Sequence, residues 1–186
     1  IAISDDKAYL YASIVTRFDP PPFSWLTCGT SYFFQYDVGA DQWTQKASLP
    51  SQYGGPTASR LELIVSPSSN QTIYTANVRI IRSTNGGTSW SGTLINPPAV
   101  HDDYHAMKFA PYDPTILFVG TDGGVYKINT SSLAATELNN GLGVATNYFS
   151  SSSIFDPYQI LTGTQDDGTN YLKNNIWSHK LGGDGF

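Results

Sequence analysis

Apolar and polar residues alternate over short runs along this chain, and Gly, Asn, Asp or Pro interrupts the alternation every six to ten residues. A period of two indicates β-strands, whereas the period of about 3.6 that marks an amphipathic helix is nearly absent. The runs are rich in Val, Ile, Tyr and Phe, which suit a pleated, half-buried surface. The pattern therefore predicts an all-β protein. The clearest predicted strands are Ala8–Val15, Tyr32–Tyr36, Leu61–Val65, Thr72–Ala76, Arg79–Arg82, Ala106–Phe109, Ile116–Gly120, Val125–Ile128 and Ile160–Gly163.

The predicted strands recur at a regular interval. Pro67, Pro111 and Pro157 each precede a strand, a tight turn and a second strand, and these prolines lie 44 and 46 residues apart. A unit of about 45 residues with short strands and a hairpin is typical of a β-propeller blade, because one sheet cannot bury both of its faces alone. We therefore expect a β-propeller segment of about four blades within one domain, residues 1–186, each blade a four-stranded antiparallel sheet. The expected blades are roughly 5–50, 60–98, 105–140 and 148–186.

Two octets of the repeat align in register. Tyr36–Trp43 lies 47 residues before Ser83–Trp90, and both octets place Gly at the fourth position and Trp at the eighth. Ser83, Asn85, Gly87 and Trp90 resemble the Asp-box (BNR-repeat) motif S-x-D-x-G-x-x-W of sialidases, xyloglucanase-type hydrolases and sortilin-type ectodomains. Asn85 stands where that motif has Asp, and its side chain can still accept hydrogen bonds from turn amides.

The stretch from His101 to Phe186 resembles the BNR-like propellers of large secreted bacterial proteins, and the first unit, through Trp43, is also similar to a kelch blade. The resemblance implies an extracellular or cell-surface location. Such families usually close with roughly six to eight blades, so the resemblance also implies that these blades belong to a larger propeller. The Asp box is a structural turn, and it implies little about function.

The Asp-Gly and Asn-Gly pairs have two interpretations. Asp122-Gly123-Gly124, Asn85-Gly86 and Asp167-Gly168 resemble loops that hold a metal or a phosphate. They also supply the positive φ angles of tight hairpin turns, and each lies between two predicted strands. The hairpin interpretation explains all three and is favoured.

His101, Asp103 and His105 are the residues with metal-ligand character. On an extended strand, side chains at i, i+2 and i+4 point to one face, so two imidazoles and a carboxylate would converge. Such a set suits Zn, Fe or Mn. The alternative is a polar strand face that lines the propeller channel. No cofactor is expected, and a metal ion at these three residues remains the alternative.

Glycoside hydrolysis needs two carboxyl groups across a glycosidic bond, or a Tyr nucleophile with an arginine cluster. Asp103, Asp166 and Asp167 are weak catalytic candidates that the sequence does not pair. The arginine context of sialidases is absent. Trp25 and Trp177 could stack on sugars, although such residues more often form the core between blades.

The net charge of −5 argues against nucleic-acid binding, which needs a basic stripe. No run approaches the eighteen apolar residues of a membrane-spanning helix, so no membrane insertion is expected. The expected partners are a glycan, a protein, or further blades of the same or another chain. The favoured function is a non-catalytic binding or scaffold module. The alternative is a part of a glycoside hydrolase of the sialidase or xyloglucanase kind.

Overall fold

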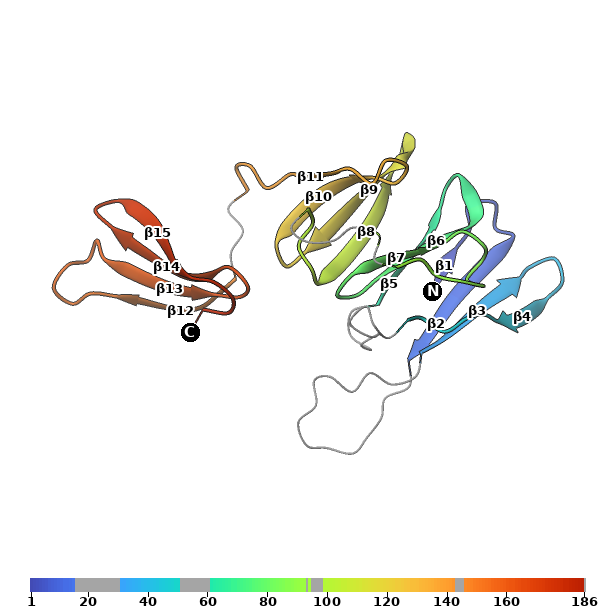
Figure 1. Ribbon diagram of the computed structural model, residues 1–186, viewed down its shortest axis with the longest axis horizontal. Coiled ribbons are helices and arrows are strands. Elements are labelled where there is room, and N and C mark those ends of the chain that lie inside the picture. Colours follow the sequence, from blue (N-terminus) through green and yellow to red (C-terminus); the bar gives the residue numbers. More distant parts are fainter. Residues whose placement is uncertain (16–30, 51–60, 93, 95–98, 143–145, 186) are drawn as a thin grey trace, which may run out of the picture.

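The computed structural model describes residues 1–15, 31–50, 61–92, 94, 99–142 and 146–185. Its strands form four antiparallel sheets that follow one another in chain order (Figure 1). These residues form no helix, and therefore no helix long and apolar enough to cross a bilayer. The all-β prediction is confirmed. Trp25 lies outside the described residues.

The first sheet has the order β1-β2-β3-β4, formed by Ala2–Ile3, Tyr9–Val15, Ser31–Asp37 and Gln42–Gln45. The second has the order β5-β6-β7, formed by Glu62–Ser66, Ser69–Ala76 and Ile80–Ser83. The third has the order β8-β9-β10-β11, formed by Tyr104–Ala110, Asp113–Thr121, Gly124–Asn129 and Ala135–Glu137. The fourth has the order β12-β13-β14-β15, formed by Asn147–Ser152, Ile160–Thr164, Gly168–Lys173 and Ile176–Leu181.

The second sheet has three strands among the described residues, but the backbone of its edge strand β7 bonds to a further segment of the chain. The amide of Ser91 donates to the Arg82 carbonyl at 2.7 Å, and the amide of Leu94 donates to the Ile80 carbonyl at 2.8 Å. The chain after β7 therefore lies along this strand, in the position that the fourth strand has in the other sheets.

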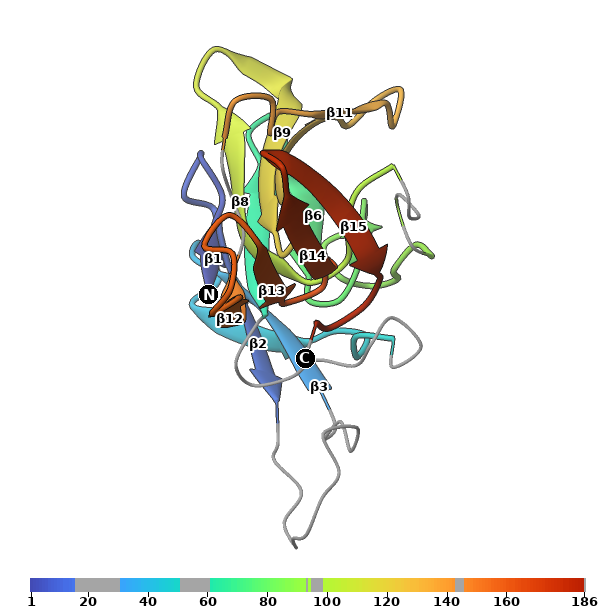
Figure 2. The same cartoon turned by 90° about the vertical axis from the view of Figure 1, so that its left-hand side faces the viewer.

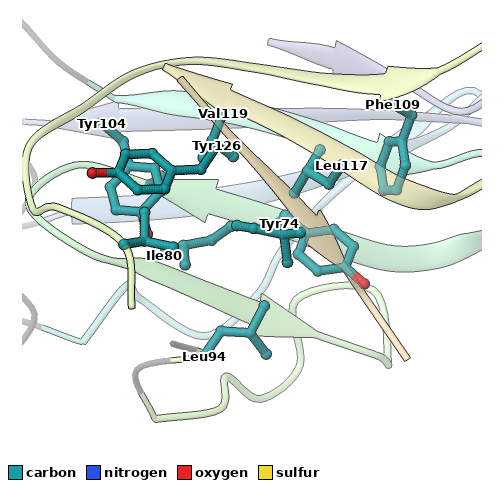
Figure 3. Close-up of a cluster of buried hydrophobic side chains, with 11 residues drawn as sticks. Tyr74, Ile80, Leu94, Tyr104, Phe109, Leu117, Val119 and Tyr126 are labelled. Carbon is teal, nitrogen blue, oxygen red and sulfur yellow. The ribbon is translucent and has the colours of Figure 1, made fainter. Parts of the chain in front are cut away.

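Two apolar clusters hold the first three sheets together, and β6 contributes to both because its successive side chains point to opposite faces. Ile73 packs with Tyr11 and Phe33 of the first sheet. Tyr74 belongs to a larger cluster with Leu117 and other residues of the third sheet (Figure 3).

The sheets stack as blades do. The first strands of neighbouring sheets lie next to each other, because β5 contacts both β1 and β8. Viewed from the side of the fourth sheet, β13 and β14 lie in front of strands of the other sheets (Figure 2). In the first three sheets the first strands β1, β5 and β8 therefore lie side by side, and β4 and β11 lie at the opposite edges of the first and third sheets.

Candidate ligand-binding site

The segment 101–105 does not have the geometry that the alternation predicts. β8 begins only at Tyr104, and Asp103 has a φ of 61°, in the left-handed region. The expected convergence of His101, Asp103 and His105 on one face of a strand is therefore wrong. Among the described residues, no group of three or more His, Cys, Asp or Glu side chains is placed to hold a metal ion.

The turn after β7 is held by its own side chains. The Ser83 hydroxyl accepts from the Gly87 amide at 2.9 Å, and Asn85 Oδ1 accepts from the Ser89 amide at 2.9 Å. Trp90 donates from Nε1 to the Ala47 carbonyl at 3.2 Å, which ties the turn to the chain that leaves the first sheet. These contacts give Ser83, Asn85 and Trp90 structural roles.

The turn between β9 and β10 brings a carboxylate to the fourth sheet. Asp122 and Gly123 are the two residues between the paired Thr121 and Gly124. Asp122 Oδ1 pairs with Nε2 of His105, and Asp122 Oδ2 accepts from Gln165 Nε2 at 3.2 Å. Asp122 therefore joins the third sheet to the loop that follows β13.

Asp166 completes this junction. Its carboxyl group lies beside that of Asp122, its buried Oδ2 has no hydrogen-bond partner among the described residues, and its amide donates to Asp184 Oδ1 at 3.1 Å. Burial raises the pKa of Asp166, and the carboxyl groups of Asp122 and Asp184 raise it further, whereas His101 opposes the shift. Neighbouring carboxylates raise this pKa because a second negative charge close by is costly. We call Asp122, Asp166 and Gln165 the carboxyl junction.

The three catalytic candidates from the sequence lie in different environments. Asp166 is part of the carboxyl junction. Asp103 is bound to Asp122 through its backbone carbonyl, which accepts the Asp122 amide at 3.1 Å. Asp167 is exposed and forms an isolated bridge with Gly183. The sequence did not identify Asp122 as the partner of Asp166, because its Gly-rich context already explained it as a turn residue.

A groove of about 460 Å³ crosses the fourth sheet. All four strands contribute to it, and none of its lining side chains is charged. Trp177 on β15 is 55% exposed beside it. The lining residues are Asn147, Ile160, Thr162, Thr164, Asn170 and Trp177.

Comparisons with known proteins concern the fold. No protein-family model and no curated protein matches this chain. A GH74 enzyme of Niastella koreensis is similar in structure, with a TM-score of 0.52 and 15% identity over 95% of this chain and 29% of that chain. The GH74 xyloglucanase of Xanthomonas campestris gives a TM-score of 0.51 and 12% identity, over 100% of this chain and 31% of that chain.

An oligogalacturonate lyase in complex with manganese is also similar, with a TM-score of 0.52 and 13% identity, over 97% of this chain and 52% of that chain. The chain thus spans about a third to a half of the length of these proteins. With the four stacked antiparallel sheets, these similarities establish the fold as a partial β-propeller. At such identities they carry no residue assignment.

Proposed function

We propose that this chain is part of a secreted or cell-surface propeller of the Asp-box (BNR-repeat) type that binds a glycan without cleaving it. The observation that carries the proposal is the groove of the fourth sheet, where the exposed ring of Trp177 lies beside hydroxyl and amide side chains. Ligand sites combine an apolar or aromatic surface with a few polar groups that fix orientation. This combination suits a sugar, which has C–H faces as well as hydroxyl groups.

The carboxyl junction argues against catalysis by its own residues. Glycosidases hold their two carboxyl groups about 5–9.5 Å apart, so that the glycosidic bond, and in inverting enzymes also a water molecule, fits between them. Asp122 and Asp166 instead lie side by side in the carboxyl junction, where Asp122 pairs with His105 and accepts from Gln165. We infer that these carboxyl groups connect the third and fourth sheets.

The second candidate function is a part of a glycoside hydrolase. The observation that favours it is that the structural matches to two GH74 enzymes extend over 95% and 100% of this chain. In that case the reacting carboxyl groups would be contributed together with other parts of a larger protein.

One experiment separates the two functions. The protein is incubated with xyloglucan, other neutral polysaccharides and polygalacturonate, while binding, release of reducing ends and formation of unsaturated products are followed. Binding without turnover is the expected result, both in the presence and in the absence of a chelator that removes metal ions. Turnover that disappears in Asp166→Asn would overturn the non-catalytic proposal.

A further inference from the structure

The groove of the fourth sheet differs from the equivalent face of the third sheet at two directly paired positions. In the third sheet Val119 pairs with Tyr126, and these side chains are 1% and 7% exposed in the apolar cluster against the second sheet. In the fourth sheet the corresponding pair is Thr162 with Asn170, and both line the groove. The small polar side chains of Thr and Asn thus replace a Val and a Tyr, so the middle of this face offers a hydroxyl and an amide for hydrogen bonds.

An aromatic surface stands at the outer side of the same face. Trp177 pairs with Leu172, which pairs in turn with Ile160 on β13. This row leads from the exposed indole to the floor of the groove. An indole next to amide and hydroxyl groups can stack on the C–H face of a pyranose ring while the polar groups bond to its hydroxyls. The volume of about 460 Å³ lies within the range of roughly 300–1,000 Å³ found for small-ligand pockets.

The charge around the groove selects against acidic sugars. None of the lining residues is cationic, and Thr164 at its end lies two positions before Asp166 of the carboxyl junction. The whole chain carries a net charge of −5. The imidazole nearest to the groove is that of His179, which pairs with Asn170 and already bonds through Nε2 to the Leu181 carbonyl. A uronate or sialate in the groove would therefore lose water without gaining a Lys or Arg partner, and it would meet a negative field.

We propose that the groove of the fourth sheet is a binding site for neutral oligosaccharides, with Trp177 as the stacking platform and Asn147, Thr162 and Asn170 as the hydroxyl-binding groups. This assignment rests on the proposed glycan-binding function and adds the location and the ligand class. It excludes oligogalacturonates and sialosides as preferred ligands of this groove.

The test is a calorimetric titration of the full chain with cellohexaose, with an oligogalacturonate of the same length and with sialyllactose. Binding of the neutral hexasaccharide is expected, with much weaker binding of both acidic sugars. Trp177→Ala should weaken binding at least about tenfold, which corresponds to about 1.4 kcal/mol. The matched control is Trp43→Ala, since Trp43 is 49% exposed on the outer strand of the first sheet, outside the groove. That control should bind as the unaltered protein does.

Each other outcome is decisive. Equal binding by Trp177→Ala and the unaltered protein would place the glycan elsewhere and overturn the site, while the proposed function would stand. Tighter binding of the oligogalacturonate would overturn the neutral-ligand assignment. If none of a wide panel of glycans bound, the proposed function itself would be overturned.

If Trp177→Ala failed to fold, Thr162→Val would replace it, because this variant keeps the side-chain shape and removes the hydroxyl. A several-fold weaker affinity of Thr162→Val supports the site, and an unchanged affinity overturns it.

Discussion

The side-chain amide of Asn85 accepts hydrogen bonds in the turn after β7 that a carboxylate could also accept. Its Oδ1 accepts from the Ser89 amide at 2.9 Å and from the Ser83 hydroxyl at 3.0 Å, while its Nδ2 donates to the Ser89 hydroxyl at 2.8 Å. The acceptor bonds need only an oxygen, which Asn and Asp share. Only the bond from Nδ2 depends on the amide.

This division predicts different effects for two substitutions. Asn85→Ala should lower the free energy of unfolding by about 1–2 kcal/mol, because the Ser89 amide and the Ser83 hydroxyl lose their acceptor. Asn85→Asp keeps the acceptor and should stay within about 0.5 kcal/mol of the unaltered protein. Urea denaturation of both variants measures the difference, and equal losses would contradict the assigned roles.

The pKa of Asp166 makes stability depend on pH. Because its pKa in the folded protein is raised above the ordinary value of 3.8 by burial and by Asp122, the folded state holds this proton to higher pH than the unfolded chain does. The contribution of Asp166 to stability is therefore greatest below about pH 4 and falls as the pH rises through its folded pKa. The groups that face it are Asp122, Asp184 and His101.

Asp166→Asn should remove this dependence, because an amide does not ionise. We expect the variant to melt at a higher temperature than the unaltered protein at pH 7, with the difference shrinking towards about pH 3. Thermal unfolding across this range measures it. Asp167→Asn, an exposed neighbour, is the control. A variant that was less stable at pH 7 would show that the charged form of Asp166 is favourable.

At the scale of elements, the interfaces between sheets differ in kind. Clusters of aliphatic and aromatic side chains lie between the first and second sheets and between the second and third. The fourth sheet is joined to the third through the carboxyl junction, and both apolar clusters exclude its residues. Leu117 and Ile160 occupy equivalent places, since they pair with Ile128 and Leu172 respectively.

These two residues permit a matched comparison. Leu117 is fully buried, so Leu117→Ala should cost about 2–5 kcal/mol through lost burial and the cavity left behind. Ile160 is only partly buried at the floor of the groove, and Ile160→Ala should cost less than about 1.5 kcal/mol. Chemical denaturation of both variants checks the order. A larger loss for Ile160 would show that an apolar interface closes over the groove.

The strands that the sequence predicted are those with an apolar alternating face. All nine predicted runs lie in strands of the structure, with ends displaced by only a few residues. Most of the strands that alternation did not reveal lie at the edges of their sheets: β4 and β12 are exposed at every residue, β15 at every residue but one, and β1 has only two residues. Their positions depend on pairing with a neighbouring strand, which no local pattern encodes.

The candidate site was harder to predict than the fold, for a physical reason. The alternation rule placed His101 and His105 on one face, but the left-handed backbone of Asp103 breaks the period. Asp122 and Asp166 are 44 residues apart and meet only through the stacking of two sheets. The sequence does not tell whether a Trp such as Trp177 is buried or exposed, and only the structure shows its exposure.

At the scale of the whole molecule, the weaker attachment of the fourth sheet should be visible in its dynamics. Local opening costs less where few apolar contacts must be broken. We expect backbone amides in β13 and β14 to exchange hydrogen faster than those in β9 and β10, as followed by mass spectrometry. Because both pairs of strands lie in the middle of four-stranded sheets, equal protection would contradict the distinction between the interfaces.

The hydrogen bonds between consecutive sheets have a consequence for how the chain folds as it is synthesised. The amides of Asp103 and Tyr104 donate to the carbonyls of Val78 and Asn77, at 2.9 and 2.7 Å, just where the chain enters the third sheet. The turn of the second sheet thus receives partners from residues that leave the ribosome later. At a synthesis rate of about 5–20 residues per second, the second sheet lacks these two partners for a few seconds after its own strands are made. We therefore expect the second sheet of the nascent chain to gain its full stability only once residues 103 and 104 have left the ribosome.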